Sequence, residues 1–252
     1  MVYMGSKAGM ADWLVPFLQK IIDEKKIKVY WEPFVGGANI IDKINCKKRV
    51  GTDKSKTLIE LLKKAQSNIE EIPLDCSRED FELARKIYRR ESTESMPLWQ
   101  IGAYQWLGSY GTRGFPGGFA PPKNGRIPYH QRLNNLKAQA PFLKDIIFYS
   151  GDFQEAGKDI NNALILCDPP YLGTKPYGYA YESKFDYEVY WEWVREKSKT
   201  NWVVCCEETF PSDFKIITST TKRRTQDTKN KKVAIEKIGV WKEGLLKEFC
   251  VS

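Results

Sequence analysis

The sequence contains a single histidine, His130, and this scarcity narrows the chemistry that the chain can perform. A Ser-His-Asp or Cys-His mechanism would have to use that one side chain. His130 lies in the polar segment 128–132, which carries no nucleophile motif. We therefore expect no catalytic histidine.

The six cysteines are scattered, and none belongs to a Cys-x-x-Cys pair with the spacing of zinc ligands. Cys167, Cys205 and Cys206 lie in or beside apolar runs, where free thiols behave as small core residues in a reducing compartment. This pattern favours a cytoplasmic protein without a metal site.

Long apolar runs are also missing. No run approaches the roughly 18 apolar residues that span a bilayer, and no basic leader precedes an apolar stretch. We expect a soluble, unsecreted protein with no membrane partner. The 252 residues are nevertheless 42% hydrophobic and 13% aromatic, which argues against disorder, and the net charge of +8 favours an anionic partner such as nucleic acid.

The most informative segment follows the apolar run 163–167, which predicts a buried strand. The next residues are Asp168, Pro169, Pro170 and Tyr171. Proline can neither donate to a sheet ladder nor continue it, so the strand should stop there, at the edge where open α/β sheets bind ligands. A carboxylate, proline-fixed carbonyls and an aromatic ring can together grip an exocyclic amino group and stack on its base. A plain strand-ending turn is the alternative.

The N-terminal part shows the strand, glycine loop and helix pattern of nucleotide sites. Residues 11–22 predict an amphipathic helix with Asp12 as its N-cap. Residues 28–32 predict a strand, residues 33–37 a glycine loop, and residues 38–44 the start of a helix.

A second short strand, residues 49–53, ends in Asp53, an acid that can reach ribose hydroxyls in a doubly wound sheet. From about Ser55 to Lys144 the pattern becomes helical and charge-rich, which indicates an insertion into the α/β core. Strand-type runs then return at residues 146–149, 163–167, 202–206, 215–218 and 234–241.

Several short sequence motifs follow one another in an order that is informative. They are Tyr3-Met4-Gly5-Ser6-Lys7, Glu32-Pro33-Phe34-Val35-Gly36-Gly37, Asp53, the glycine-rich loop 113–122, Asp152-Phe153 and Asp168 to Tyr171. In this order they resemble the DNA adenine-N6 methyltransferases of the Dam type. Taken singly, the motifs have ordinary explanations such as an exposed turn, a tight turn or a helix cap. The chain departs from the family at 205–208, where Cys-Cys-Glu-Glu stands in place of the Ser-Asn of many members, and this weakens any role assigned there.

The resemblance implies an α/β fold: a Rossmann-like S-adenosylmethionine-dependent methyltransferase sheet with helices on both faces and an inserted, mainly helical target-recognition domain. The core would comprise residues 1–55 and 148–252, and the insertion residues 56–147. The implied activity is site-specific transfer of a methyl group from S-adenosylmethionine to N6 of a flipped adenine in double-stranded DNA. S-adenosylhomocysteine is the expected product, and no metal is expected.

The resemblance also assigns the site. It makes Asp168, Pro169, Pro170 and Tyr171 catalytic. It places the cofactor on Tyr3 and Lys7 at its methionyl end, on Gly36 and Gly37 beneath it, on Asp53 at the ribose, and on Asp152 and Phe153 around the adenine. The implied cofactor site also includes Glu32, Pro33, Phe34 and Asp168. Lys7 is the expected partner of the cofactor carboxylate.

Basic residues of the insertion are candidates for reading guanine edges, and those of the C-terminal stretch for contacting phosphates. The first group is Arg113, Lys123, Arg126 and Arg132; the second is Lys222, Arg223, Arg224, Lys229, Lys231 and Lys232. A solvated hairpin is the alternative for the second group.

Two rival functions stay open: N4-cytosine DNA methylation, which uses the same grip on an amine, and a catalytically inactive DNA-binding relative. We expect a monomer, and a cognate restriction endonuclease is an open option as its partner.

Overall fold

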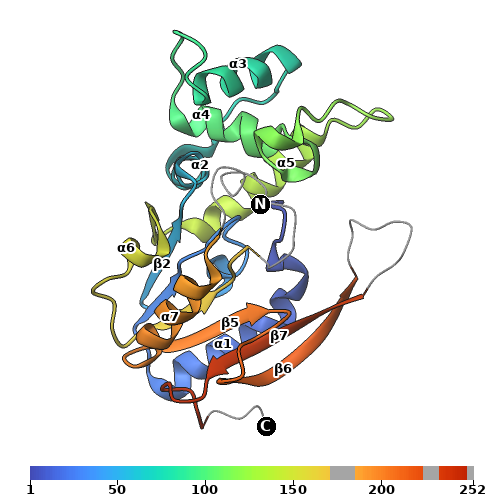
Figure 1. Cartoon of the computed structure of the whole chain (residues 1–252). Helices are drawn as coiled ribbons and strands as arrows, with labels where there is room; N and C mark the ends of the chain where they lie inside the picture. Colours follow the sequence, from blue (N-terminus) through green and yellow to red (C-terminus); the bar gives the residue numbers. More distant parts are fainter. Residues whose placement is uncertain (171–184, 224–232, 249–252) are drawn as a thin grey trace.

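A seven-stranded sheet in the order β3-β2-β1-β4-β5-β7-β6 forms the centre of the molecule (Figure 1). The computed structural model describes residues 1–170, 185–223 and 233–248, without the side chains of residues 222, 223, 233 and 234. The strands are β1 (Val29–Glu32), β2 (Lys48–Asp53), β3 (Ile146–Ser150), β4 (Leu164–Cys167), β5 (Trp202–Glu207), β6 (Phe214–Arg223) and β7 (Val233–Trp241).

Strands β1 to β5 are parallel, and β7 runs antiparallel to both β5 and β6. The order 3-2-1-4-5 is that of a doubly wound sheet. Strands β1 to β3 extend the sheet toward one edge, and β4 and β5 extend it toward the other, so the strand order reverses between β1 and β4. This topology confirms the predicted Rossmann-like sheet. It also places the topological switch point where Asp168 follows β4.

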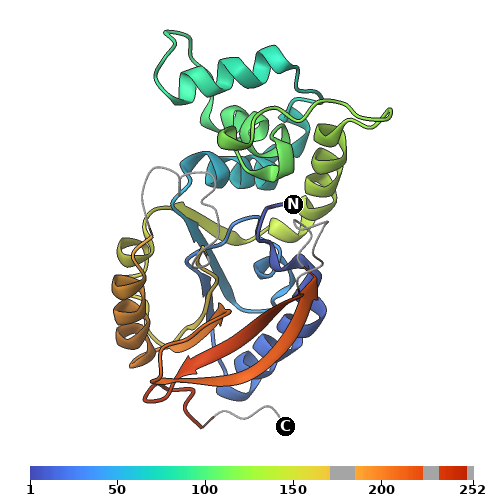
Figure 2. The ribbon, with the colours of Figure 1, turned by 45° about the vertical axis from the view of Figure 1, so that its right-hand side comes forward.

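Helices cover both faces of the sheet (Figure 2). Helix α1 (Ala11–Lys25) lies on one face, and α6 (Phe153–Ala156) and α7 (Tyr187–Ser198) lie on the other. Alternate residues of β4 enter two separate cores: Leu164 and Leu166 pack on the α1 side, and Ile165 and Cys167 on the α7 side. A strand buried on both faces has no polar alternation, which explains its continuous apolar run.

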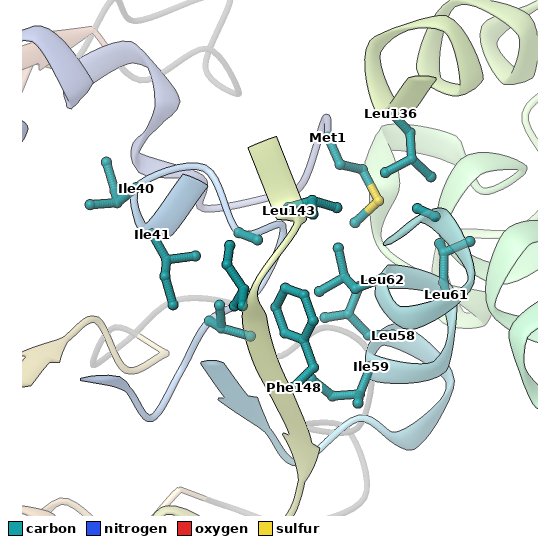
Figure 3. Close-up of a cluster of buried hydrophobic side chains, with 14 of the residues drawn as sticks. Met1, Ile40, Ile41, Leu58, Ile59, Leu61, Leu62, Leu136, Leu143 and Phe148 are labelled. Carbon is teal, nitrogen blue, oxygen red and sulfur yellow. The ribbon is translucent and has the colours of Figure 1, made fainter. Parts of the chain in front are cut away.

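The helices between β2 and β3 gather at one end of the molecule (Figure 1). They are α2 (Lys56–Asn68), α3 (Arg78–Tyr88), α4 (Leu98–Gly102), η4 (Ala103–Leu107) and α5 (Pro128–Gln139). We call residues 56–143, with the turns between these helices, the helical segment. Leu58 and Leu62 of α2 pack around Phe148 of β3 (Figure 3), so the segment and the sheet share one continuous core. The division at residues 56–147 stays a prediction.

The prediction that a helix starts over residues 38–44 is wrong. Only the 3-10 turn η2 (Ile41–Lys43) forms there. Gly36 and Ala38 have φ of 49° and 56°, so the backbone makes a left-handed turn on leaving β1 and crosses to β2 without a helix. The glycine loop is therefore held by neighbouring segments.

The N-cap predicted at Asp12 is also wrong. A 3-10 turn, η1 (Lys7–Met10), runs directly into α1, and the Ser6 hydroxyl accepts a hydrogen bond from the Ala8 N–H at 3.0 Å. Asp12 instead lies in the first turn of α1, where a negative charge favours the helix dipole. Across the described ranges, no helix combines the length and apolar character needed to cross a bilayer.

Candidate active site

The carboxyl ends of the parallel strands carry a row of acids. β1 ends in Glu32, β2 in Asp53 and β5 in Glu207, and Asp168 directly follows β4. We call this row the carboxyl edge. Asp168 is 22% exposed, whereas Glu32, Asp53 and Glu207 are each 5% exposed or less. Of these four acids, Asp168 is the most open to a substrate.

Lys7 joins the N-terminal motif to Asp168. Its Nζ lies 2.5 Å from Asp168 Oδ1 and 3.2 Å from Glu236 Oε1 of β7. Burial by itself lowers the pKa of the ammonium, but the charges of Asp168 and Glu236 outweigh burial and raise it. The structure thus places Lys7 against the predicted catalytic carboxylate, and its contact with the cofactor carboxylate stays a prediction.

The glycine loop is shaped by Tyr3. A Cβ on Gly37 would lie 2.8 Å from the Tyr3 Cβ, and a Cβ on Gly36 would lie 3.0 Å from the Tyr3 ring. Tyr3 also packs on Trp106 of η4, with ring centroids 5.3 Å apart. The loop needs glycine because a side chain at either position would collide with Tyr3.

Asp53 ties the glycine loop to the start of α2. Its carboxylate accepts hydrogen bonds from the Gly36 N–H at 3.1 Å and the Ser55 N–H at 2.9 Å. Burial raises the pKa of Asp53 to about 6, against these two hydrogen bonds. These hydrogen bonds give Asp53 a structural role. Its contact with a ribose stays a prediction.

Aromatic rings line the α7 side of the carboxyl edge. Phe34 lies 5.3 Å from Phe153 and 5.9 Å from Phe185 between ring centroids. Asp152 caps α6 by accepting from the Gln154 N–H at 3.1 Å. The structure therefore brings two predicted cofactor residues, Phe34 and Phe153, into direct contact. Phe34 is only partly buried, so its ring is available to a flat ligand.

The remaining loop residues lie deeper. Glu32 accepts a hydrogen bond from the Tyr30 hydroxyl at 2.8 Å, and burial raises the pKa of Glu32 to about 8 against that bond. Pro33 is buried beside it. The predicted contact of both residues with a cofactor stays a prediction.

The two prolines of the signature differ in their surroundings. Pro169 is buried, and the carbonyl oxygen of Pro170 accepts a hydrogen bond from the Tyr187 hydroxyl at the start of α7. Tyr171, the predicted stacking residue, lies outside the described residues.

Sequence reasoning missed two acids, Glu207 and Glu236. Glu207 is 2% exposed, and in the described part of the chain its Oε1 has no hydrogen-bond partner. Burial raises the pKa of Glu207 to about 8, and the charge of Asp168 adds to this. An acid ending a strand beside β4 could have signalled Glu207. Glu236 carries no such signal, because it lies within a strand.

Lys123 and Arg126 flank the tip of a tight turn in the helical segment. Each backbone N–H donates to the other residue's carbonyl, at 2.9 and 3.0 Å, and Asn124 and Gly125 between them have positive φ. Both basic side chains are exposed. They are therefore accessible to a nucleic acid.

The other predicted DNA contacts differ. Arg132 Nη1 donates to the carbonyls of Leu107 and Ser109, each at 2.7 Å, and burial lowers the Arg132 pKa. Arg132 thus holds a loop in place. Arg113 is partly buried. Lys222 and Arg223 end β6 with undescribed side chains, and Arg224, Lys229, Lys231 and Lys232 lie outside the described residues.

Residues 3–95 match the family of D12 class N6 adenine-specific DNA methyltransferases. This match indicates an adenine-specific DNA methyltransferase. The matched residues include Tyr3, Lys7, the glycine loop and Asp53. No curated protein matches the chain. Among solved structures it is similar to the rRNA methyltransferase AviRa of Streptomyces viridochromogenes, with 10% identity, coverage of 90% of this chain and 84% of that one, and a TM-score of 0.38, a likeness too remote to carry an argument.

The match to the D12 class implies DNA as substrate and S-adenosylmethionine as methyl donor. The chemistry of the carboxyl edge fits that cofactor. Around Asp168 lie two further buried acids and the ammonium of Lys7, and the carboxyl oxygens of these acids suit contact with a sulfonium cation. The partly exposed Phe34 ring, packed on Phe153, suits a flat adenine.

Proposed function

We propose that Asp168 carries the transfer of a methyl group to N6 of an adenine flipped out of double-stranded DNA. One observation carries this proposal. At the switch point of the sheet, Asp168 is the most accessible of four acids, the other three being buried, and the buried Lys7 ammonium favours its ionised form. An ionised carboxylate at that place can accept a hydrogen bond from an amine.

The nitrogen to be methylated is a poor nucleophile, because its lone pair is delocalised into the ring. When bound, S-adenosylmethionine supplies an electrophilic methyl group. The Asp168 carboxylate and the Pro169 carbonyl each accept a hydrogen bond from one of the two N6 hydrogens. These hydrogen bonds draw the nitrogen toward sp3 geometry and turn its lone pair toward the methyl group. The Pro170 carbonyl, already bonded to Tyr187, fixes the turn. Catalysis is then positioning plus electrostatic stabilisation of charge on N6.

Asp168 need not be a strong base in this mechanism. The amine proton becomes acidic only once the methyl group has arrived, so the carboxylate accepts it late. A target adenine within a duplex must flip to reach Asp168, at a cost of a few kcal/mol. By the motif, Tyr171 stacks on the flipped base and offsets about 1–3 kcal/mol of that cost.

The helical segment is the proposed target-recognition domain. Its support is the exposed turn that carries Lys123 and Arg126. The helices of this segment lie at the end of the molecule away from α1 (Figure 1). Arginine is the usual reader of guanine edges, and lysine is suited to phosphates. The basic stretch from Lys222 is the second proposed contact, with phosphates only.

We also propose a cytoplasmic monomer. The DNA substrate and the free thiols of Cys46, Cys76, Cys167, Cys205 and Cys206 support the location. A cognate restriction endonuclease is an optional partner in this proposal, since modification of DNA can serve protection or regulation.

Methylation of a random-sequence DNA pool tests the function. The modified bases are mapped at single-molecule resolution, and the nucleosides are identified by mass spectrometry. We expect N6-methyladenine within one recurrent sequence. N4-methylcytosine would overturn the assigned base. Retardation of DNA without methylation, and without heat on titration with S-adenosylmethionine, would show an inactive binder.

A further inference from the structure

We propose that Glu236 of β7 is a positioning residue for methyl transfer, which holds the Lys7 ammonium and through it the Asp168 carboxylate. This inference rests on the proposed role of Asp168. It assigns a part of the reaction to the antiparallel C-terminal hairpin, far from every motif that marks the site in the sequence.

The geometry places Glu236 behind Lys7. Cys206 of β5 pairs with Ile238 of β7, and both side chains enter the core on the α1 side. Since strand side chains alternate, Glu236 points to the same side as Ile238. There its Oε1 lies 3.2 Å from Lys7 Nζ, which lies 2.5 Å from Asp168 Oδ1. Lys7 therefore bridges the two carboxylates.

Because the bridge is buried, its two ion pairs depend on Lys7 and Glu236 themselves. Lys7 is 4% exposed and Glu236 is 3% exposed, so water cannot replace either partner. A buried carboxylate is costly unless it is paired, and removing one member of a buried pair strands the other charge. With Glu236 in place the ammonium has a fixed site, and a fixed ammonium holds Asp168 in one orientation.

Other titratable groups face this bridge. The Cys206 thiol lies beside it from β5, and burial raises the pKa of that thiol beyond its ordinary range. Glu207, also on β5, interacts electrostatically with both Asp168 and Lys7. Burial raises the pKa of Glu236, the charge of Lys7 opposes this shift, and the charge of Asp168 adds to it. The balance of charge at Asp168 therefore depends on Glu236.

The decisive variant is Glu236→Gln, which removes the charge and keeps the size. We expect kcat to fall about 10-fold, since small displacements of reacting groups cost up to about 100-fold. The KM and the calorimetric Kd for S-adenosylmethionine should change less than about 2-fold. The acid limb of the kcat profile should move to lower pH, because a lost neighbouring negative charge favours ionised Asp168. Glu243→Gln, an exposed acid just beyond β7, is the matched control.

A double-mutant cycle with Lys7→Met tests the route through Lys7. Lys7→Met strands Glu236, so adding Glu236→Gln should restore part of the thermal stability that Lys7→Met loses. In the Lys7→Met background, Glu236→Gln should not lower kcat further. The stability arm gives an answer even if Lys7→Met is inactive.

Three results would overturn the inference: wild-type kcat in Glu236→Gln, additive stability losses in the double variant, or a kcat loss matched by an equal rise in KM for the cofactor. Asp168→Asn separates this failure from that of the proposed function. If Asp168→Asn is inactive while Glu236→Gln is normal, only Glu236 has been misassigned. If Asp168→Asn keeps full activity, the proposed function itself fails.

Discussion

The two sides of the carboxyl edge differ in chemistry. On the α1 side, Lys7 bridges Asp168 and Glu236 in a buried, charged group. On the α7 side, Phe34 and Phe153 pack with other rings in an aromatic cluster. Methyl transfer to an aromatic amine needs both kinds of surface, because charge must develop at one atom while flat rings are held beside it. The alternation of strand side chains lets one sheet provide both.

The largest effect should come from the charged side. Lys7→Met removes the ammonium from Asp168, and we expect kcat to fall about 10²–10³-fold, the cost of losing a preorganised electrostatic contact. The Kd for S-adenosylmethionine, measured by calorimetry, should rise less than about 3-fold. If the Kd instead rises as much as kcat falls, Lys7 serves the cofactor carboxylate and not Asp168.

The aromatic side should show the reverse pattern. Phe34→Ala removes a partly exposed ring from the cluster with Phe153. We expect KM for S-adenosylmethionine to rise about 10-fold with kcat almost unchanged, since ring stacking is worth about 0.5–1.5 kcal/mol beyond the buried area. Phe142→Ala, at a ring that is 61% exposed in the helical segment, is the control. A fall in kcat with unchanged KM would show that the two sides are not separate.

The aromatic side also holds one buried acid, Glu207, whose protonation can be tested separately. Strand alternation puts it on the face of Cys205, and its pKa is raised to about 8 from the ordinary 4.5, mainly by burial. The folded state therefore holds this proton more tightly than the unfolded state. The free energy of unfolding should fall as pH rises from about 4.5 to about 8, by an amount on the order of a few kcal/mol.

Glu207→Gln should flatten that dependence. Urea unfolding at several pH values should give the variant a smaller loss between pH 5 and pH 9 than the wild type shows. Glu248→Gln, at an exposed acid, should leave the dependence unchanged. An equal slope in Glu207→Gln and wild type would mean that Glu207 is ionised in the folded protein at neutral pH.

The smallest effect concerns the exposed turn that we propose as a DNA contact. Lys123→Ala and Arg126→Ala should each weaken DNA binding severalfold. If either contacts a phosphate, the slope of log affinity against log salt falls by about 0.9. Lys28→Ala, an exposed lysine before β1, should change neither quantity. Unchanged binding in the turn variants would move the DNA contact to another surface.

Local signals predicted much of this site, and pairing between distant strands determined the rest. The apolar run before Asp168 predicted β4, because a strand buried on both faces must be continuously apolar. The glycine loop was predicted as well, but the helix after it was not, because Ala38 adopts a positive φ that its sequence does not signal. β6 is longer than predicted, since residues 219–223 are polar and only their pairing with β7 makes them a strand.

Glu236 shows the limit most clearly. It reaches Lys7 because β7 inserts between β5 and β6, and no residue near position 236 indicates that order. The same holds for the contact of Tyr3 with the glycine loop, which joins two motifs that are more than thirty residues apart. Motifs predicted the chemistry, and the sheet topology determined which distant residues lie beside Asp168.

Methyl transfer to adenine N6 should depend on the Asp168 carboxylate. This dependence is tested most directly by quantifying N6-methyladenine, by nucleoside mass spectrometry, in DNA treated with wild-type enzyme and with Asp168→Ala at saturating S-adenosylmethionine. We expect abundant N6-methyladenine from the wild type and none above background from Asp168→Ala, with cofactor binding largely retained in calorimetry. Near-normal N6-methyladenine from Asp168→Ala would contradict this dependence.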